Sequence, residues 1–227
     1  MPQEQLTVNA RPLQRVLILL AAFVYLLSLI GVVWTPALGG ILNSIALLLL
    51  GGAVGWFTAA RLAPTPQRLG IGVQARWRRE RTLALGGVAT VYLTLIFGTV
   101  VSTTGGLWSC TTLPLCAALD GETGITLLHR GIAATATVLT LVLAIRATRS
   151  HHERIFRPAA FWAVGLILAQ NIAGLLLVLA AGQGESLSLT YARLAHFTLG
   201  AFTWSAVVVL ATLVVAIPPL KRPVALD

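Results

Sequence analysis

The chain has 227 residues, of which 57% are hydrophobic and only 10% are charged. Soluble domains of this size carry about 25% charged residues, so the composition excludes an ordinary soluble protein. The formal net charge is +9. Because the basic residues are confined to short segments between apolar runs, we expect no nucleic-acid partner and a membrane protein instead.

Six apolar runs are long enough to cross a bilayer, since about 20 helical residues span about 30 Å of hydrocarbon. They cover residues 16–33, 38–60, 83–101, 125–145, 159–181 and 189–217. The predicted fold is all-α and polytopic, with six transmembrane helices. If these helices alternate, all Lys and Arg residues except Arg130 and Arg193 fall on one side. The positive-inside rule then predicts a plasma-membrane protein with both termini in the cytoplasm.

The first two runs and the basic segment after them form one predicted unit, residues 1–81, a membrane hairpin followed by a cytoplasmic loop. Asn43 and Ser44 are its internal polar groups within the membrane, so packing surfaces are expected there and no site. Residues 82–227 form the second predicted unit, a four-helix bundle.

Cys110 and Cys116, the only cysteines, fall in the outer loop between the third and fourth predicted helices. Two thiols cannot fill a tetrahedral zinc shell, and the outer face of a membrane is oxidising, so we expect a disulfide, with free thiols as the alternative. The bond would stiffen residues 102–124 into a lid over the helix ends.

His129 and His196 lie a few residues inside the outer ends of the fourth and sixth predicted helices, which run in the same direction. Their depths agree within about 5 Å at helical rise. Ionisable side chains within a membrane usually mark a site, so the pair predicts one shared ligand, a haem iron held from both sides.

Arg130 and Arg193 stand beside the two histidines and would meet the haem propionates at the outer surface. In the alternative interpretation the arginines reach the lipid headgroups and the histidines only hydrogen-bond between helices. Gln170 and Asn171 either hydrogen-bond between helices or contact the edge of a bound haem or quinone. His151 and His152 are expected to be solvated in an inner loop.

The run GTVVSTTGGLWSCTTLPLC at residues 98–116, followed by LLHRG at 127–131, resembles the heme A synthase family. LAQNIAGLLLVLA at 168–180 and LAHFTLGAF at 194–202 are similar to later helices of the same unit, and the resemblance covers residues 83–215. It implies a membrane oxidoreductase that converts the methyl group of haem O into the formyl group of haem A. His129 and His196 would bind a haem B cofactor, with haem O or haem A as substrate or product.

The family usually has two such bundles and a glutamate three residues before the first histidine. This chain has one bundle, so a homo-oligomer or a larger membrane complex is expected, and it has Thr126 at the glutamate position. Glu122 is the candidate catalytic replacement, with a solvated loop carboxylate as the alternative. Two further functions stay open: a non-catalytic b-type cytochrome subunit of a respiratory or photosynthetic complex, and an assembly protein without haem.

Overall fold

The computed structural model describes residues 19, 20, 22–24, 26, 27, 30, 36–61, 71–112, 116, 121–151, 153–184 and 186–219. These residues form helices and no strand, so the prediction of an all-helical fold is confirmed. The helices with complete bounds are α2 (Pro36–Arg61), α3 (Ile71–Thr103), α4 (Gly106–Ser109), α5 (Gly121–Ser150), α6 (Phe156–Ala181) and α7 (Leu187–Ala216).

Four of these helices, α3, α5, α6 and α7, are long and apolar enough to cross a membrane, which indicates a multi-pass membrane protein. In α2 the apolar stretch is the shorter segment Gly40–Gly55. The first predicted span falls largely outside the described residues. Six spans therefore stay a prediction, as does the division into two units at residue 81, a position that α3 runs across.

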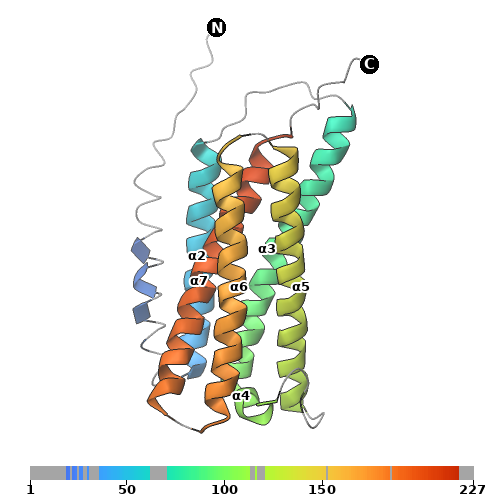
Figure 1. Ribbon diagram of the computed structural model, residues 1–227. Helices are drawn as coiled ribbons and strands as arrows, with labels where there is room; N and C mark the ends of the chain where they lie inside the picture. Colours follow the sequence, from blue (N-terminus) through green and yellow to red (C-terminus); the bar gives the residue numbers. More distant parts are fainter. Residues whose placement is uncertain are drawn as a thin grey trace.

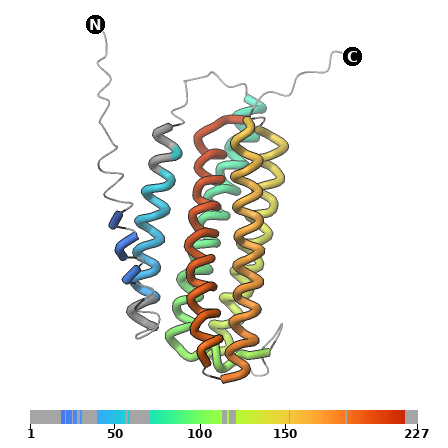
Figure 2. The backbone as a smooth tube through the Cα atoms, turned by 60° about the vertical axis from the view of Figure 1, so that its left-hand side comes forward, coloured from blue at the N-terminus to red at the C-terminus, as the bar shows by residue number. Residues whose placement is uncertain are grey.

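The four long helices stand side by side, with α3 packed on α5 and α6 packed on α7 (Figure 1). The two pairs join through α3 with α7 and through α5 with α6, which leaves α5 and α7 diagonal to each other. α2 packs against α3 and α7 and covers the seam between them (Figure 2). The cavity described below lies among the four long helices.

Small side chains let these helices approach closely, as is usual in membrane proteins. Ala84, Ala136, Ala144 and Ala163 are buried at the contacts between helices, together with larger residues of α7. The tryptophan Trp204 of α7 donates a hydrogen bond from Nε1 to the backbone oxygen of Leu47 in α2, at 2.6 Å. This bond fastens α2 to the side of the four long helices.

α3 is much longer than the predicted span, because it begins at Ile71 and includes the basic segment expected to be a loop. Its 33 residues extend about 50 Å, so about 20 Å projects beyond the hydrocarbon. Trp77 in this projection donates a hydrogen bond from Nε1 to the backbone oxygen of Val214, at 2.9 Å. This contact with α7 explains why the basic segment is held as helix.

His151 is buried, so the expectation that it would be solvated is wrong. Its Nε2 lies 3.1 Å from Glu80 Oε2 in α3, and its ring stacks on Phe156 with centroids 4.2 Å apart. The carboxylate of Glu80 and the ring of Phe156 together shield the imidazole from solvent. His152 lies outside the described residues.

At the opposite end, a lid covers the helices. Gly105 adopts φ 81°, a left-handed conformation that favours glycine, and starts the short helix α4. Cys110 and Cys116 form the expected disulfide, with Cα atoms 5.0 Å apart. α4 contacts α3, α5 and α6, so this part of the predicted lid lies over the helix ends; residues 113–115 and 117–120 of that lid lie outside the described residues. We call this the lid end and the opposite one the basic end.

Candidate functional site: a cavity between two histidines

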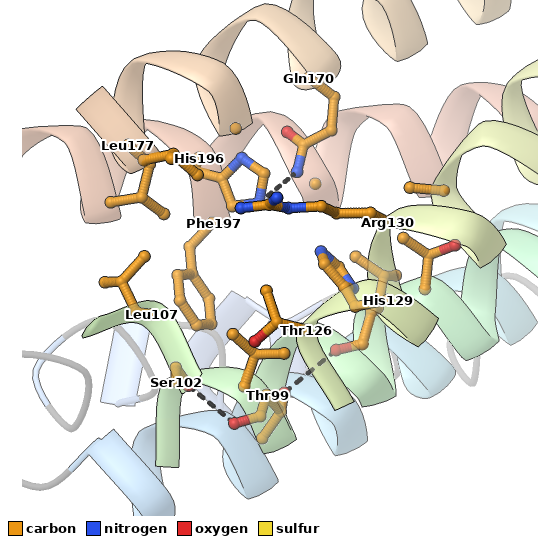
Figure 3. A pocket seen from close by; sticks show the side chains of 18 of the residues that line it. Thr99, Ser102, Leu107, Thr126, His129, Arg130, Gln170, Leu177, His196 and Phe197 are labelled. Atoms are coloured by element: carbon orange, nitrogen blue, oxygen red, sulfur yellow. Dashed lines mark hydrogen bonds between the residues drawn. The ribbon is translucent and has the colours of Figure 1, made fainter. Parts of the chain in front are cut away.

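A cavity of about 380 Å³ lies among α3, α5, α6 and α7 near the lid end (Figure 3). His129 and His196 line it, and so do Arg130 and Arg193. Pockets of roughly 300 to 1,000 Å³ are typical of small-molecule and cofactor sites. The structure therefore brings the four predicted binding residues to one cavity.

The two histidines reach the cavity at matching depth. His129 is eight residues beyond the first residue of α5, Gly121, and His196 is nine beyond the first residue of α7, Leu187. At helical rise these offsets are about 12 Å and 14 Å. The imidazoles extend into the cavity from two different helices (Figure 3).

Each imidazole lies against a glycine of the helix paired with its own. A Cβ added to Gly98 of α3 would be 3.1 Å from Cε1 of His129, and one added to Gly174 of α6 would be 3.2 Å from Cε1 of His196. Since both distances are shorter than ordinary van der Waals contact, each glycine makes room for a ring. The helix pairs α3 with α5 and α6 with α7 thus repeat one arrangement.

Polar atoms inside the cavity lack partners within the described part of the chain. Nδ1 of His129, Nδ1 of His196 and Oε1 of Gln170 are buried without a hydrogen bond. Asn43 of α2 also lines the cavity, and its Oδ1 is likewise buried and unpartnered. Leaving such groups unpaired is costly, so together they suit a ligand that supplies partners.

One hydrogen bond in the cavity defines the state of His196. Nε2 of Gln170 lies 3.3 Å from Nε2 of His196 (Figure 3). An amide nitrogen only donates, so this ring nitrogen accepts and a neutral imidazole carries its proton on Nδ1. In that tautomer the lone pair of Nε2 accepts from Gln170, so this nitrogen binds a metal only when Gln170 no longer donates to it.

The two arginines fasten the lid to the cavity. Arg130 donates to the backbone oxygen of Cys110 at 2.8 Å and to that of Thr112 at 2.9 Å. The guanidinium of Arg193 lies over the ring of Trp108 in α4, 5.7 Å from its centroid. Both are cations at the lid end of the cavity, where the sequence predicted them, and both also hold the lid.

Glu122, the candidate catalytic residue, does not line the cavity; it is exposed in the first turn of α5. Thr126 does line it, and its hydroxyl donates to the backbone oxygens of Gly106 at 2.9 Å and Glu122 at 3.1 Å. The threonine at the family's glutamate position therefore joins α5 to the lid, and the Glu122 carboxylate lies outside the cavity, near Gly105.

The two adjacent amide residues of α6, Gln170 and Asn171, make different contacts. Gln170 contacts His196, as described, while Asn171 donates to the hydroxyl of Thr137 in α5 at 2.9 Å. Asn43 of α2 is a lining residue that the sequence assigned to packing only. The sequence did contain a cue, because Asn43 is one of the few polar residues in a largely apolar helix and the only amide among them.

No family model matches the chain. It is 41% identical over 226 residues to the protoheme IX farnesyltransferase of Roseiflexus castenholzii (strain DSM 13941 / HLO8), which covers 98% of this chain and 41% of that relative. It is 40% identical over 207 residues to the protein of the same name from Roseiflexus sp. (strain RS-1), over 91% of this chain and 38% of the relative. The chain thus spans about two fifths of the length of these relatives.

These names overturn the expectation of a heme A synthase-like oxidoreductase in haem A biosynthesis, and with it the alternative of a b-type cytochrome subunit. The resemblance depended on the cysteine loop, the His-Arg pair and the second histidine. Those residues form a pocket and the lid above it. A pocket of this kind is compatible with a protein that prenylates haem as well as with one that oxidises it.

The expectation of a metal-binding oxidoreductase is corrected as well, because both relatives are named as farnesyltransferases. Among the residues that the structure describes, no three His, Cys, Asp or Glu side chains gather where they could hold a metal ion. Any iron at the two histidines would enter as part of a porphyrin.

Proposed function

We propose that this chain binds protoheme IX for farnesylation, with the porphyrin between His129 and His196. The observation that carries the proposal is the pair of imidazoles at matching depth in one cavity, each against a glycine of the neighbouring helix. The names of the two relatives supply the ligand and the reaction, since protoheme IX is what a protoheme IX farnesyltransferase prenylates.

The lining residues fit the chemistry of this ligand. The two imidazoles supply nitrogen ligands for iron, one from each helix pair. Arg130 and Arg193 supply positive charge at the lid end, where haem propionates would pair with them. Protoheme is the substrate in this proposal: it supplies the porphyrin that receives the farnesyl group, and the chain binds and orients it.

The orientation in the membrane is part of the proposal. Arg76, Arg78 and Arg79 lie at the basic end with Arg146 and Arg149, whereas the disulfide lies at the lid end. The positive-inside rule and the redox preference of disulfides both support an orientation with the basic end in the cytoplasm and the lid outside the plasma membrane. The described residues form one such cavity between two histidines, so we propose that a second haem would be held by a second copy or another subunit.

The test is a spectroscopic titration of the purified chain in detergent with protoheme IX. We expect a six-coordinate, low-spin spectrum with saturable binding. His129→Gly and His196→Gly should each abolish that spectrum, and added imidazole should restore it because it replaces the missing ligand. Thermal unfolding of the ligand-free variants checks that they fold.

Two results would contradict the proposal. One is a wild-type chain that does not bind protoheme; the other is a pair of folded glycine variants that keep the wild-type spectrum. Farnesylation is then followed in cells that express the chain with its natural partners, where extracted haems are separated by chromatography. Loss of farnesylated haem in the His129→Gly strain is the expected result.

A further inference from the structure

We propose that the cavity opens sideways into the lipid between α5 and α6, and that the opening accommodates the isoprenoid chain of a farnesylated haem. This inference rests on the proposed function. The opening is defined by the exposure of the residues that line the cavity. Three of them are exposed: Ala134 of α5, and Asn171 and Leu175 of α6. All the other lining residues are buried or half-buried.

The other sides of the cavity are covered by protein. α2 covers the seam between α3 and α7, where Asn43 is 3% exposed and Leu47 is fully buried. The lid covers the end of the cavity through Leu107 and Cys110, both buried lining residues. Within the described part of the chain, the cavity therefore meets the surface at the seam between α5 and α6, two helices that lie side by side in Figure 1.

The opening has two defined limits along the seam. Toward the basic end, the hydrogen bond from Asn171 to Thr137 joins the two helices at 2.9 Å. Toward the lid end, Arg130 lies one helical turn from Ala134 and is bonded to the lid. Between these limits the lining residues of α5 are Ala133 and Ala134, each with a single methyl group, and Ala134 is the exposed one.

The chemistry around the opening indicates its occupant. Leu175 is 43% exposed, and its neighbours Ile172, Leu176 and Leu179 are exposed as well. In a membrane these side chains contact lipid hydrocarbon. A farnesyl group is a flexible apolar chain attached to the edge of the porphyrin, so it would lie in this opening while the iron-bearing macrocycle stays between the histidines.

The binding test compares protoheme IX with haem O, a haem that carries the farnesyl-derived chain. Ala134→Phe fills the opening, whereas Val138→Phe adds the same ring one turn away on α5, where the side chain is 58% exposed and does not line the cavity. We expect Ala134→Phe to weaken haem O binding about tenfold relative to protoheme, since an overfilled site is costly. Val138→Phe should leave the ratio of the two affinities unchanged.

A labelling experiment covers the case in which Ala134→Phe folds poorly. Both native cysteines are in the disulfide, so Ala134→Cys provides a single reactive thiol for a membrane-permeant maleimide. We expect haem O to abolish labelling at this position and protoheme to leave most of it. Val138→Cys is the matched control and should be labelled equally with either haem.

The outcomes separate this inference from the proposed function. Suppose that protoheme binds, but that Ala134→Phe and Val138→Phe change the affinity for haem O equally, or that both haems protect Ala134→Cys equally from labelling. Then the opening does not hold the isoprenoid group, and only this inference fails. If light scattering shows that Ala134→Phe breaks an oligomer, a second copy covers the seam and the inference is overturned. If the wild-type chain binds neither haem, the proposed function fails and this inference fails with it.

Discussion

The ring of His129 lies directly against the backbone of Gly98, so close that a methyl group on Gly98 would be 3.1 Å from Cε1. Gly174 and His196 repeat this relationship in the second helix pair, at 3.2 Å. Two glycines therefore determine where the two imidazoles stand. They act as positioning residues, because they set the rings without contacting a ligand through a side chain.

We predict that Gly98→Ala and Gly174→Ala each displace the neighbouring imidazole by a few tenths of an ångström and weaken protoheme binding. Overpacking of this kind costs about 1 to 2 kcal/mol, or roughly five- to thirtyfold in affinity. Titration with protoheme measures the affinity, and electron paramagnetic resonance reports the orientation of the imidazole planes.

Gly131→Ala is the control for these two substitutions, because a Cβ at Gly131 meets nothing within 4 Å. It should keep the wild-type affinity and stabilise α5 by up to about 1 kcal/mol. An unchanged resonance spectrum in both Gly98→Ala and Gly174→Ala would show that these glycines do not position the rings.

The buried pair of Glu80 and His151 should behave as a coupled unit at the basic end. Glu80→Leu or His151→Leu alone leaves one polar partner buried without the other, at a cost of about 3 to 5 kcal/mol in the free energy of unfolding. The double variant should cost less than the sum of the single variants, because no polar group is left unpaired.

Thermal unfolding in detergent measures the four proteins of this cycle, and the exposed Glu122 supplies the control. Glu122→Gln should change the stability by less than about 0.5 kcal/mol and leave haem binding intact, since the carboxylate lies outside the cavity. Strictly additive effects of Glu80→Leu and His151→Leu would contradict the coupling.

Trp204→Phe should loosen α2 while it keeps an aromatic ring beside Tyr92, whose centroid is 5.3 Å from that of Trp204. The variant loses the hydrogen bond to the backbone oxygen of Leu47, a loss of about 0.5 to 1.5 kcal/mol. The melting temperature reports this loss, and faster proteolysis of α2 reports where it acts.

Trp162→Phe makes the same chemical change at a side chain that is 59% exposed. Its melting temperature should match that of the wild type. If Trp204→Phe also melts like the wild type, then the bond to Leu47 does not fasten α2.

Much of the fold could be predicted from hydrophobic length alone. Apolar runs at 125–145, 159–181 and 189–217 correspond closely to α5, α6 and α7, because few charges interrupt them. The start of α3 could not be read in this way. Its first turns are rich in arginine, and they are held as helix by tertiary contacts of Trp77 and Glu80.

The candidate site was also predictable in part. His129 and His196 stood out because ionisable groups are rare in apolar helices. The partners of these histidines could not be identified, since nothing in the sequence pairs Gly98 with His129 or Gly174 with His196. The reaction was not predictable either, because residues that describe a pocket for haem do not say what is done to it.

The cavity has two similar halves, because each helix pair contributes one histidine that lies against one glycine. Protoheme has a nearly symmetric ring whose edges carry different substituents. Two equivalent imidazoles would bind the iron equally well in either of two porphyrin orientations related by a half-turn. They therefore do not determine which orientation is bound. The orientation is instead determined by the different surroundings of the cavity. The helix α2 covers the seam between α3 and α7, lipid borders the seam between α5 and α6, and two arginines lie beneath the lid.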